Sequence, residues 1–502
     1  MASSSVFIER RARLAEALRA AGGGVAVIPT APERQRNSDN DHPFRHDSAF
    51  HYLTGFDEPG AWLVLHASGT SALGCHASNP EMEIWHGHRL GVDAAPAALG
   101  VDAAFDVDTL DAAILARLDG TPAVWFPFGA GAEVARRVNG WLATLRGRAR
   151  SDVEAPMVQR DLAPLVGEMR LFKDAGELAT MRRAAQISAD AHVRAMRYSA
   201  ARFRAAPNGT VREYEIEAEL LHEFRRRGAQ SPAYPSIVAA GANACVLHYA
   251  ASDAELRAGE LCLIDAGCEL DGYASDITRT FPADGRFTPA QRELYEIVLA
   301  AQQAAVDATR PGARQRDAHH AAVRVLTQGM LDSGLLDRDA VGGVDDAIRS
   351  SAYRQFYMHG TGHWLGRDVH DVGEYLSLGE APGPQIDGMG REVVMKPSRV
   401  LEAGMVVTLE PGLYVRPAVG VPERFWHIGI RIEDDAVVTD TGCELISRGV
   451  PVAAADIEAL MKDARAERWA APMGHDVAHF VDHAARIPSG DRPTYPSAEG
   501  HQ

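Results

Sequence analysis

Two segments of this 502-residue chain repeat a single pattern, and the repeat restricts the folds open to the chain. Residues 256–267 and 401–412 align without a gap, with a leucine, a glycine, an acid and a second glycine at matching positions. The matching acids are Asp265 and Glu410, and each follows a short apolar run of the kind that forms a buried strand. We therefore expect two similar halves, related by a pseudo-twofold axis, that bring the two acids together.

The first of these segments continues into a predicted β-hairpin. Residues 261–264 are apolar and residues 277–281 alternate with β-branched side chains, so both segments are predicted to be strands. Asp271 and Gly272 lie between them and form a dipeptide that favours a two-residue hairpin turn.

This turn sets a register that places two aspartates on one face of the hairpin. Asp265 opposes Thr278, and Asp276 becomes its diagonal neighbour, about 7–8 Å away at the backbone. Either aspartate alone could be an ordinary turn residue, because aspartate is common in turns. A carboxylate at the end of a buried apolar strand, however, needs a partner or a metal ion. We predict that the pair binds a cation.

The second segment is followed by a matching second acid. Glu433 follows Glu410 in the strand-like segment 429–433, as Asp276 follows Asp265. Four carboxylates that converge without counter-ions would repel one another strongly, so the arrangement implies bound divalent cations. A shell of oxygen ligands favours a hard ion such as Mn²⁺ or Mg²⁺ over a thiolate-bound zinc ion.

Composition narrows the possible functions. The chain carries 68 acidic and 51 basic side chains, a net charge of −17, which argues against a nucleic-acid partner. Its five cysteines include no CxxC pair, so neither a disulfide framework nor a thiolate metal site is predicted. No apolar stretch has the length of a membrane span, and we expect a cytoplasmic protein without a membrane partner.

The chain is predicted to be α+β, with two domains and a C-terminal extension. Residues 1–172 combine apolar runs with alanine-rich helical stretches, which indicates a smaller α/β domain. The irregular segment 151–167, which contains two prolines, is interpreted as a boundary region. Residues 173–464 form the second domain, and residues 465–502 are predicted to be a flexible, solvated tail.

Two helices are predicted near the start of the second domain. Asp174 and Glu177 have the spacing of a capping box, followed by apolar residues at helical intervals. A second helix is predicted from about residue 211 to residue 227, where apolar side chains recur at every fourth position.

Four histidines near the acidic segments are candidates for the same site. His248 follows the second predicted helix, and His359, His363 and His370 lie together farther along the chain. A lone histidine usually has no functional role, but the group of three is harder to dismiss. The glycines between its first two members argue for a loop that approaches a ligand closely. One imidazole would suit a carboxylate-rich dimetal site, and the others could donate hydrogen bonds to a reacting carbonyl.

Four blocks occur in order along the second domain: IDAGCELDGYASDITRTF, MHGTGHWLGRDVHDVG, LEAGMVVTLEPGLY and GIRIEDD. They resemble the metal-binding blocks of the pita-bread metallopeptidases, most closely those of the Xaa-Pro aminopeptidase (aminopeptidase P) family. FRHDSAFHYLTGFDEPGAWLVL and IWHGHRLGVDAAPAALGVD in the first domain resemble the amino-terminal domain of the same enzymes. The resemblance implies a C-terminal pita-bread catalytic domain behind the smaller α/β domain.

The resemblance also implies roles for particular residues, most of which lie in these blocks. Asp276 and Glu433 are expected to bridge two Mn²⁺ ions, although other divalent metals could bind, and the full ligand set is Asp265, Asp276, His363, Glu410 and Glu433. A hydroxide that bridges the ions is expected to attack the scissile carbonyl, with Glu410 as the proton shuttle. The residues expected to bind the substrate or to stabilise the tetrahedral intermediate are His248, His359 and His370, with Arg431 and Tyr414 near them.

The implied reaction is hydrolysis of the peptide bond before a penultimate proline. A prolidase, which acts on dipeptides, is the main alternative, because both enzymes cleave before proline. Trp85 lies in a block that resembles the aminopeptidase version, in which an aromatic residue lines an open cleft, and we therefore expect an aminopeptidase. The filled ligand positions argue against a non-catalytic binding module and against a metal-free hydrolase such as creatinase. The relatives suggest a homo-oligomer, either a dimer or a tetramer.

Three segments depart from the family pattern. Segment 374–397 is longer than expected, and its glycine and proline content indicates a loop at the rim of the site. Residues 199–208 resemble an insertion. In the tail, His475, His479 and His483 have a spacing that could bind metal in a helix, but the composition there favours a solvated extension.

Overall fold

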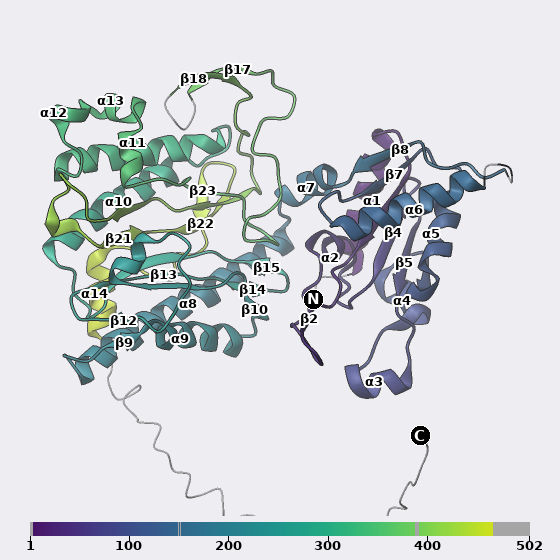
Figure 1. Cartoon of the computed structure of the whole chain (residues 1–502), viewed down its shortest axis with the longest axis horizontal. Coiled ribbons are helices and arrows are strands. Elements are labelled where there is room, and N and C mark those ends of the chain that lie inside the picture. Colours follow the sequence, from purple (N-terminus) through teal and green to yellow (C-terminus); the bar gives the residue numbers. More distant parts are fainter. Residues whose placement is uncertain (1–3, 149, 151, 387–390, 465–502) are drawn as a thin grey trace, which may run out of the picture.

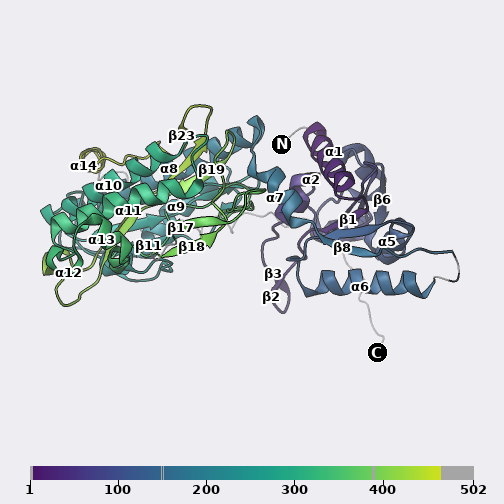
Figure 2. The same ribbon diagram turned by 90° about the horizontal axis from the view of Figure 1, so that it is seen from above.

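The computed structural model describes residues 4–148, 150, 152–386 and 391–464. Two domains lie side by side (Figure 1), and the view from above shows the same elongated arrangement (Figure 2). The predicted tail at 465–502, with its three histidines, lies outside the described residues. No helix within the described ranges is long and apolar enough to cross a membrane.

A six-stranded mixed sheet forms the centre of the N-terminal domain. Its strands follow the order β6-β5-β4-β1-β7-β8, with β1 antiparallel to β4 and parallel to β7. Two apolar runs of the sequence form β1 and β4. The strands are β1 (Val25–Pro29), β4 (Trp62–His66), β5 (Ser71–Cys75), β6 (Ala103–Asp106), β7 (Ala123–Phe126) and β8 (Val158–Asp161), with a separate hairpin of β2 (Gln35–Asn37) and β3 (Asn40–Asp41).

Helices cover both faces of this sheet because its side chains alternate between the faces. Ala26 and Ile28 of β1 pack into the cluster that includes α1, α2, α4 and α7, whereas Val25 and Val27 pack against α5 and α6. The helices of this domain are α1 (Ser4–Ala20), α2 (Ser48–Thr54), α3 (Pro80–His86), α4 (Gly91–Leu99), α5 (Leu110–Leu118), α6 (Ala132–Gly147) and α7 (Ala163–Leu171).

The C-terminal domain contains the predicted repeat as two antiparallel ladders. In the first half β13 pairs with β16, and in the second half β19 pairs with β22. The strands are β9 (Val211–Arg212), β10 (Ser231–Pro232), β11 (Ile237–Ala240), β12 (Glu255–Leu256), β13 (Leu261–Asp265), β14 (Cys268–Leu270), β15 (Tyr273–Ala274), β16 (Thr278–Pro282), β19 (Val406–Leu409), β20 (Gly412–Val415), β21 (Ile428–Arg431), β22 (Asp434–Val438) and β23 (Cys443–Leu445).

Two pairs of long helices enclose these strands. Figure 1 shows α10 and α11 on one side of the strands and α8 and α9 on the other. The predicted capping box at Asp174 and Glu177 is present at the start of α8. The second predicted helix begins at Glu213, two residues late, because residues 211–212 pair as β9 with β12. The helices are α8 (Ala175–Ala205), α9 (Glu213–Arg226), α10 (Pro289–Ala308), α11 (Gln315–Ser333), α12 (Arg338–Val341), α13 (Val344–Arg349) and α14 (Ala454–Lys462).

Segments predicted to be irregular contain regular structure. Segment 151–167 includes β8, a polar strand that the apolar pattern could not reveal and that pairs with β7, and the start of α7. Segment 374–397 contains an antiparallel pair, β17 (Gly383–Ile386) and β18 (Glu392–Met395), so the prediction of a plain loop is wrong. Residues 199–205 form the last turns of α8, where the side chains of Ser199 and Phe203 are buried.

Ion pairs connect the two domains directly. Arg10 of α1 lies 2.9 Å from Asp174 and 3.3 Å from Glu177, so the capping box of α8 also holds the N-terminal domain. Arg45 lies 2.8 Å from Glu269 in β14. Because Arg10 and Glu177 are buried, these contacts fix the N-terminal domain against the strands that carry the candidate site.

Candidate dimetal active site

The predicted hairpin forms with the register expected from its turn. Asp265 at the end of β13 pairs with Thr278 of β16. Asp271 and Gly272 adopt φ angles of 50° and 75°, as a two-residue turn of type I′ requires. The turn residues therefore determine which side chains of the hairpin share a face.

A tyrosine hydroxyl connects the two aspartates of this hairpin. The hydroxyl oxygen of Tyr234 lies 2.7 Å from Oδ1 of Asp265 and 2.5 Å from Oδ1 of Asp276. Carboxylates only accept hydrogen bonds, and a hydroxyl has one proton, so the two acids share a single donor. Asp265 and Asp276 are therefore held close together by one hydroxyl proton that cannot serve both.

The acids of the second half meet this pair. Glu410 directly follows β19, and Glu433 directly precedes β22. The backbone N–H of Glu433 donates to the backbone carbonyl of Thr278. In return, the side-chain hydroxyl of Thr278 donates to Oε2 of Glu433 at 2.7 Å. The two hairpins thus contact each other through the residues that adjoin their acids.

His363 completes a compact group of possible ligands. One ligand atom from each of Asp276, His363 and Glu433 lies within 4.8 Å of the other two. Nε2 of His363 lies 3.5 Å from Asp276 and 3.7 Å from Glu410. Asp265 adjoins the group through the shared tyrosine, so the structure brings all five predicted ligands together.

The electrostatics of the group show an excess of negative charge. Burial, followed by repulsion from the neighbouring acids, raises the pKa of Glu433 well above its usual range and that of Glu410 to about 7. Burial alone would lower the pKa of His363, but Asp276 and Glu410 outweigh it and raise that pKa to about 9. Burial is thus the main cause of the shifts at the two glutamates, and the neighbouring carboxylates are the cause of the shift at His363.

These residues fit divalent cations. Arg431, whose Nη2 lies 2.6 Å from Asp265, is the one arginine or lysine that forms an ion pair with the four acids among the described residues. One guanidinium cannot balance four carboxylates. Oxygen donors with a single imidazole are the ligand set of a hard or borderline divalent ion.

A hydrogen-bonded chain leads from this group to His359. Arg431 donates to the hydroxyl of Tyr414 at 3.0 Å, and that oxygen lies 2.8 Å from Nε2 of His359. Nδ1 of His359 lies 2.7 Å from the carbonyl of Gly360. A neutral imidazole that donates to Gly360 and accepts from Tyr414 satisfies every contact, and burial with Arg431 nearby lowers the pKa of His359 to about 3.

The other two candidate histidines lie at the same site. The ring of His370 is 4.2 Å from the ring of His363. His248 follows the short helix η3 (Gly241–Cys245). Burial lowers the pKa of both His359 and His370, and His248 is a smaller contributor to both shifts. His370 has no hydrogen-bond partner among the described residues, so its ring nitrogens are available to a substrate.

The loop that carries His370 is anchored at the domain junction. The next residue, Asp371, accepts from Arg170 at 2.5 Å and from Lys173 at 3.1 Å. All three side chains are almost fully buried. The junction between α7 and α8 therefore holds the histidine loop in place.

Trp85 is the one predicted site residue that the structure does not bring to this group. It lies on α3 of the N-terminal domain, with 80% of its surface exposed. Figure 1 shows α3 well apart from the strands that carry the ligands. The sequence block could indicate an aromatic residue but not its distance from the acids.

Two residues of the site carried no recognisable sequence signal. Tyr234 lies in the turn between β10 and β11, where nothing indicated a contact with the aspartates. Asp435 accepts hydrogen bonds from the backbone N–H of Asp276 and is fully buried. It was visible only as one more acid after Glu433, and its role as a support depends on tertiary contacts.

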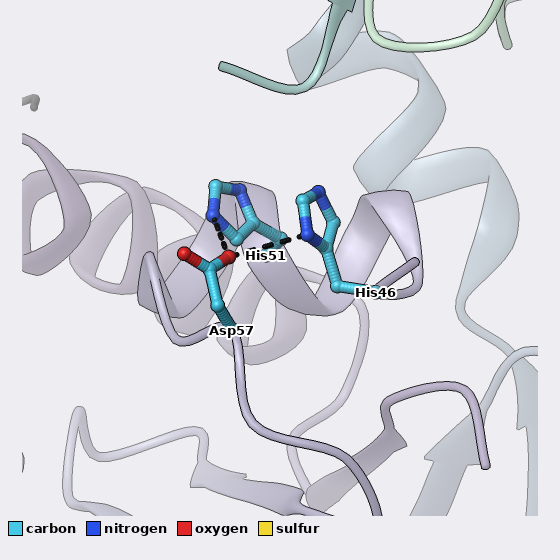
Figure 3. A group of neighbouring side chains, drawn as sticks. All are labelled: His46, His51 and Asp57. Carbon is cyan, nitrogen blue, oxygen red and sulfur yellow. Dashed lines mark ion pairs between the residues drawn. The ribbon is translucent and has the colours of Figure 1, made fainter. Parts of the chain in front are cut away.

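A second group of possible ligands lies in the N-terminal domain (Figure 3). Both imidazoles point toward the carboxylate of Asp57, at 3.2 Å for His46 and 2.8 Å for His51. On the opposite nitrogen, Nδ1, His51 contacts the guanidinium of Arg367 from the C-terminal domain. A neutral imidazole has one N–H, so Nδ1 accepts from Arg367 and Nε2 donates to Asp57. With Nε2 protonated, His51 has no lone pair for a metal ion.

The fold and the site together define a class of protein. A duplicated domain that converges four carboxylates and one histidine, preceded by a separate α/β domain, is a two-domain hydrolase of the metal-dependent kind.

Comparison with known proteins gives the family. Residues 179–440 match metallopeptidase family M24, and residues 7–125 match the aminopeptidase P N-terminal domain. The Xaa-Pro aminopeptidase of Escherichia coli (strain K12) is 44% identical, over 92% of this chain and 99% of the relative. The Xaa-Pro aminopeptidase of Haemophilus influenzae is 40% identical, over 91% of this chain and 96% of the relative.

Solved structures agree with this result. The structure of aminopeptidase PepP from Pseudomonas aeruginosa has a TM-score of 0.82 at 45% identity and covers 91% of this chain and 98% of that chain. A variant of Escherichia coli aminopeptidase P in complex with substrate has a TM-score of 0.83 at 42% identity and covers 92% and 99%. The chain belongs to metallopeptidase family M24 and, within it, to the Xaa-Pro aminopeptidases; it is a metallo-aminopeptidase.

Proposed function

We propose that this enzyme removes the first residue from peptides whose second residue is proline, with two Mn²⁺ ions as its cofactor. The observation that supports the proposal best is the convergence of four acids and one histidine, with Asp276 and Glu433 buried, in a chain 44% identical to a Xaa-Pro aminopeptidase. The residues that would hold the ions are Asp265, Asp276, His363, Glu410 and Glu433, of which Asp276, His363 and Glu433 form the most compact group.

The excess of carboxylate charge supports the choice of metal. Bound divalent cations supply Lewis-acid polarisation of the scissile carbonyl and lower the pKa of the attacking water. A shell of carboxylate oxygens with one imidazole nitrogen favours Mn²⁺ or Mg²⁺ over ions that prefer sulfur ligands. The five cysteines lie outside this group.

Glu410 is the proposed proton shuttle. Its pKa is raised to about 7, first by burial and then by the nearby acids, so it can both accept and return a proton near neutral pH. It lies beside His363, on the strand end that faces the other acids. The attacking water would give its proton to Glu410, which would pass it to the leaving proline nitrogen.

The histidines are proposed to bind the substrate and the developing oxyanion. His370 offers ring nitrogens without a partner in the described chain, next to the metal ligand His363. His359 is held by Tyr414, which is held by Arg431, so this chain fixes an imidazole at the edge of the site. His248 lies near both histidines and is proposed to assist them.

A homo-oligomer is the proposed assembly. Ile84 and Trp85 are 81% and 80% exposed on the short helix α3, and adjacent large apolar side chains of this kind are usually covered by a partner. Since Trp85 lies apart from the metal ligands of its own chain, it can contact substrate only in the cleft of another copy. We further propose a cytoplasmic enzyme, with the division between its domains near residue 172, where α7 ends and α8 has not yet begun.

The test is a comparison of kcat/KM on three synthetic peptides with the same first residue. Ala-Pro-Ala-Ala should be cleaved after the first residue at least about tenfold more efficiently than Ala-Pro, a difference of about 1.4 kcal/mol in transition-state binding. Ala-Ala-Ala-Ala should be poorer still. A tenfold preference for the dipeptide would instead identify a prolidase.

A further inference from the structure

A cavity of about 350 Å³ lies directly behind the loop that carries His359. Residues 358–362 of that loop form one wall, and the first turns of α11 form another. Its volume is within the range of small-ligand sites and can hold a side chain or the end of a peptide. The loop is therefore shared between this cavity and the metal site.

The cavity is cationic in an acidic protein. Arg316 and Arg354 line it together with His319, His320 and His359, and none of its lining residues, all of which belong to the described chain, is acidic. The whole chain has a net charge of −17, which would otherwise repel an anion. A local concentration of positive charge in a concave, partly enclosed site attracts anions despite the net charge, because distant charges are screened by salt.

The charge of the cavity resides on its arginines. Burial and the neighbouring cations lower the pKa of His319 to about 4, so this imidazole is neutral near pH 7. Arg316 contacts the sulfur of Met395 at 3.6 Å and has no acidic partner among the described residues. Its neighbour Arg314, by contrast, forms an ion pair with Glu380 at 2.9 Å, outside the cavity. Arg316 therefore faces the cavity with its charge unbalanced.

Contacts join the cavity to the metal-binding loop. Nδ1 of His319 lies 2.8 Å from the hydroxyl of Thr361, whose carbonyl accepts from the backbone N–H of Glu410 at 2.8 Å. Nε2 of Gln315 donates to the carbonyl of Gly362 at 3.4 Å. His359 lines the cavity, and its Nδ1 lies 3.8 Å from Oε2 of Glu410. Burial, then Arg431 and His319, lower its pKa.

The inserted hairpin borders the same cavity. Met395 of β18 packs on Arg316, and Tyr375, at the start of the inserted segment, is one of the lining residues. Tyr375 is fixed by stacking on Trp364 with ring centroids 5.5 Å apart. Figure 1 shows β17 and β18 beside the start of α11, so the segment that departs from the family pattern lies where the cavity is formed.

These two regions suit the two ends of a peptide. An aminopeptidase places the positive N-terminal amine near its catalytic group, which here consists of acids. The part of the peptide beyond the proline extends away from that group. We propose that the cavity is a specificity subsite that binds a carboxylate beyond the penultimate proline, and that Arg316 is its main determinant. This proposal rests on the proposed aminopeptidase function.

The carboxylate could be an acidic side chain at the third position or the free C-terminus of a short peptide. Four substrates separate the two sources: Ala-Pro-Glu-amide against Ala-Pro-Gln-amide, and free Ala-Pro-Ala against its amide. A charge-assisted bond to a partly exposed guanidinium predicts a preference of about tenfold in kcat/KM for the charged member of at least one pair. The pair that shows the preference identifies the source.

Two variants assign the effect to the cavity. Arg316→Gln should reduce the preference to within twofold while kcat/KM for the neutral peptides stays within twofold of wild type. Arg324→Gln is the matched control, because Arg324 lies on the same helix, exposed and paired with Asp345. It removes the same charge outside the cavity and should retain the full preference.

Three outcomes are informative. Equal cleavage of charged and neutral peptides by wild type, or equal loss of the preference in both variants, would overturn the subsite. Failure to cleave any of the four peptides would contradict the aminopeptidase function instead. In that case the cavity can still be tested by calorimetry, with the binding of Pro-Glu-amide compared with that of Pro-Gln-amide. Tighter binding of the glutamate peptide that is lost in Arg316→Gln would support the subsite. Equal binding of the two peptides would refute it.

Discussion

The part of the chain that the structure describes contains two groups of converging histidine and acidic side chains, and one of the two is suited to metal ions. The group around Asp276 and Glu433 is buried, and four acids there face one arginine. The group of His46, His51 and Asp57 has one acid, 73% exposed at its side chain, and one arginine beside it. Proximity of ligand atoms is common to both groups, so it cannot be what distinguishes them.

Charge balance is the difference. In the N-terminal group the charges of Asp57 and Arg367 balance, and both imidazoles lie within hydrogen-bond distance of the carboxylate. In the C-terminal group the pKa of Glu433 is raised well above its usual range, because burial and neighbouring acids oppose its charge. A metal site can thus be recognised by buried carboxylate charge that the protein's own cations do not balance.

Asp276→Asn should give the largest loss. The substitution removes a charge from the centre of the acidic group, and we expect kcat/KM on Ala-Pro-Ala-Ala to fall at least about a hundredfold. Asp271→Asn changes a turn residue on the other side of the hairpin and should retain activity within about threefold, because asparagine also tolerates positive φ. Similar losses in both variants would show that the register argument fails.

His370→Ala should lower turnover without loss of metal. The ring lies beside His363 but is outside the five proposed ligands, so kcat should fall about tenfold to a hundredfold while metal content stays at the wild-type level. His363→Ala, measured in parallel, should lose metal. Metal loss in His370→Ala would place that residue among the ligands.

His51 predicts a measurable dependence of stability on pH. Burial, with Arg367 adding, lowers its pKa from 6.5 to about 4, although the hydrogen bond to Asp57 acts in the other direction. The unfolded chain therefore binds this proton more readily, so the stabilisation is complete above pH 6.5 and is lost as the pH falls toward 4.

His51→Gln keeps one donor and one acceptor but cannot titrate in this range. Between pH 6.5 and pH 4, wild type should lose about 2 kcal/mol more unfolding free energy than the variant. Urea unfolding at a series of pH values measures the difference. Parallel curves for the two proteins would show that His51 does not titrate as its surroundings predict.

The smallest effect concerns metal at the N-terminal group. His46→Gln should leave the metal content unchanged. A metal ion on Nε2 of His51 would require the ring proton to move to Nδ1, and Nδ1 already accepts a hydrogen bond from Arg367. Elemental analysis after dialysis against Mn²⁺ or Zn²⁺ gives the stoichiometry. One ion fewer per chain than wild type would make this group a metal site after all.

Local signals in the sequence were sufficient for much of the site. The dipeptide Asp271-Gly272 specifies a turn, and the turn fixes the register that brings Asp265 opposite Thr278. The repeat then located the second pair of acids. These inferences succeeded because hairpin pairing and strand ends are determined by residues close together in the sequence.

The parts that sequence could not supply depend on tertiary contacts. Tyr234 joins the aspartates from a loop about thirty residues earlier, and the polar strand β8 exists because β7 offers it hydrogen bonds. Arg367, in the loop between two site histidines, reaches the N-terminal domain to contact His51. Nothing local to these residues reveals such partners, and the same holds for the distance of Trp85 from the acids.

We expect the four carboxylates to be functional only when divalent cations balance their charge. The most direct measurement is a titration of chelator-treated enzyme with Mn²⁺, with bound metal and kcat/KM on Ala-Pro-Ala-Ala followed together. We predict no activity in the metal-free protein and recovery that is complete at two ions per chain. Full activity without metal, or recovery that is unrelated to metal bound by the intact acidic group, would contradict the claim.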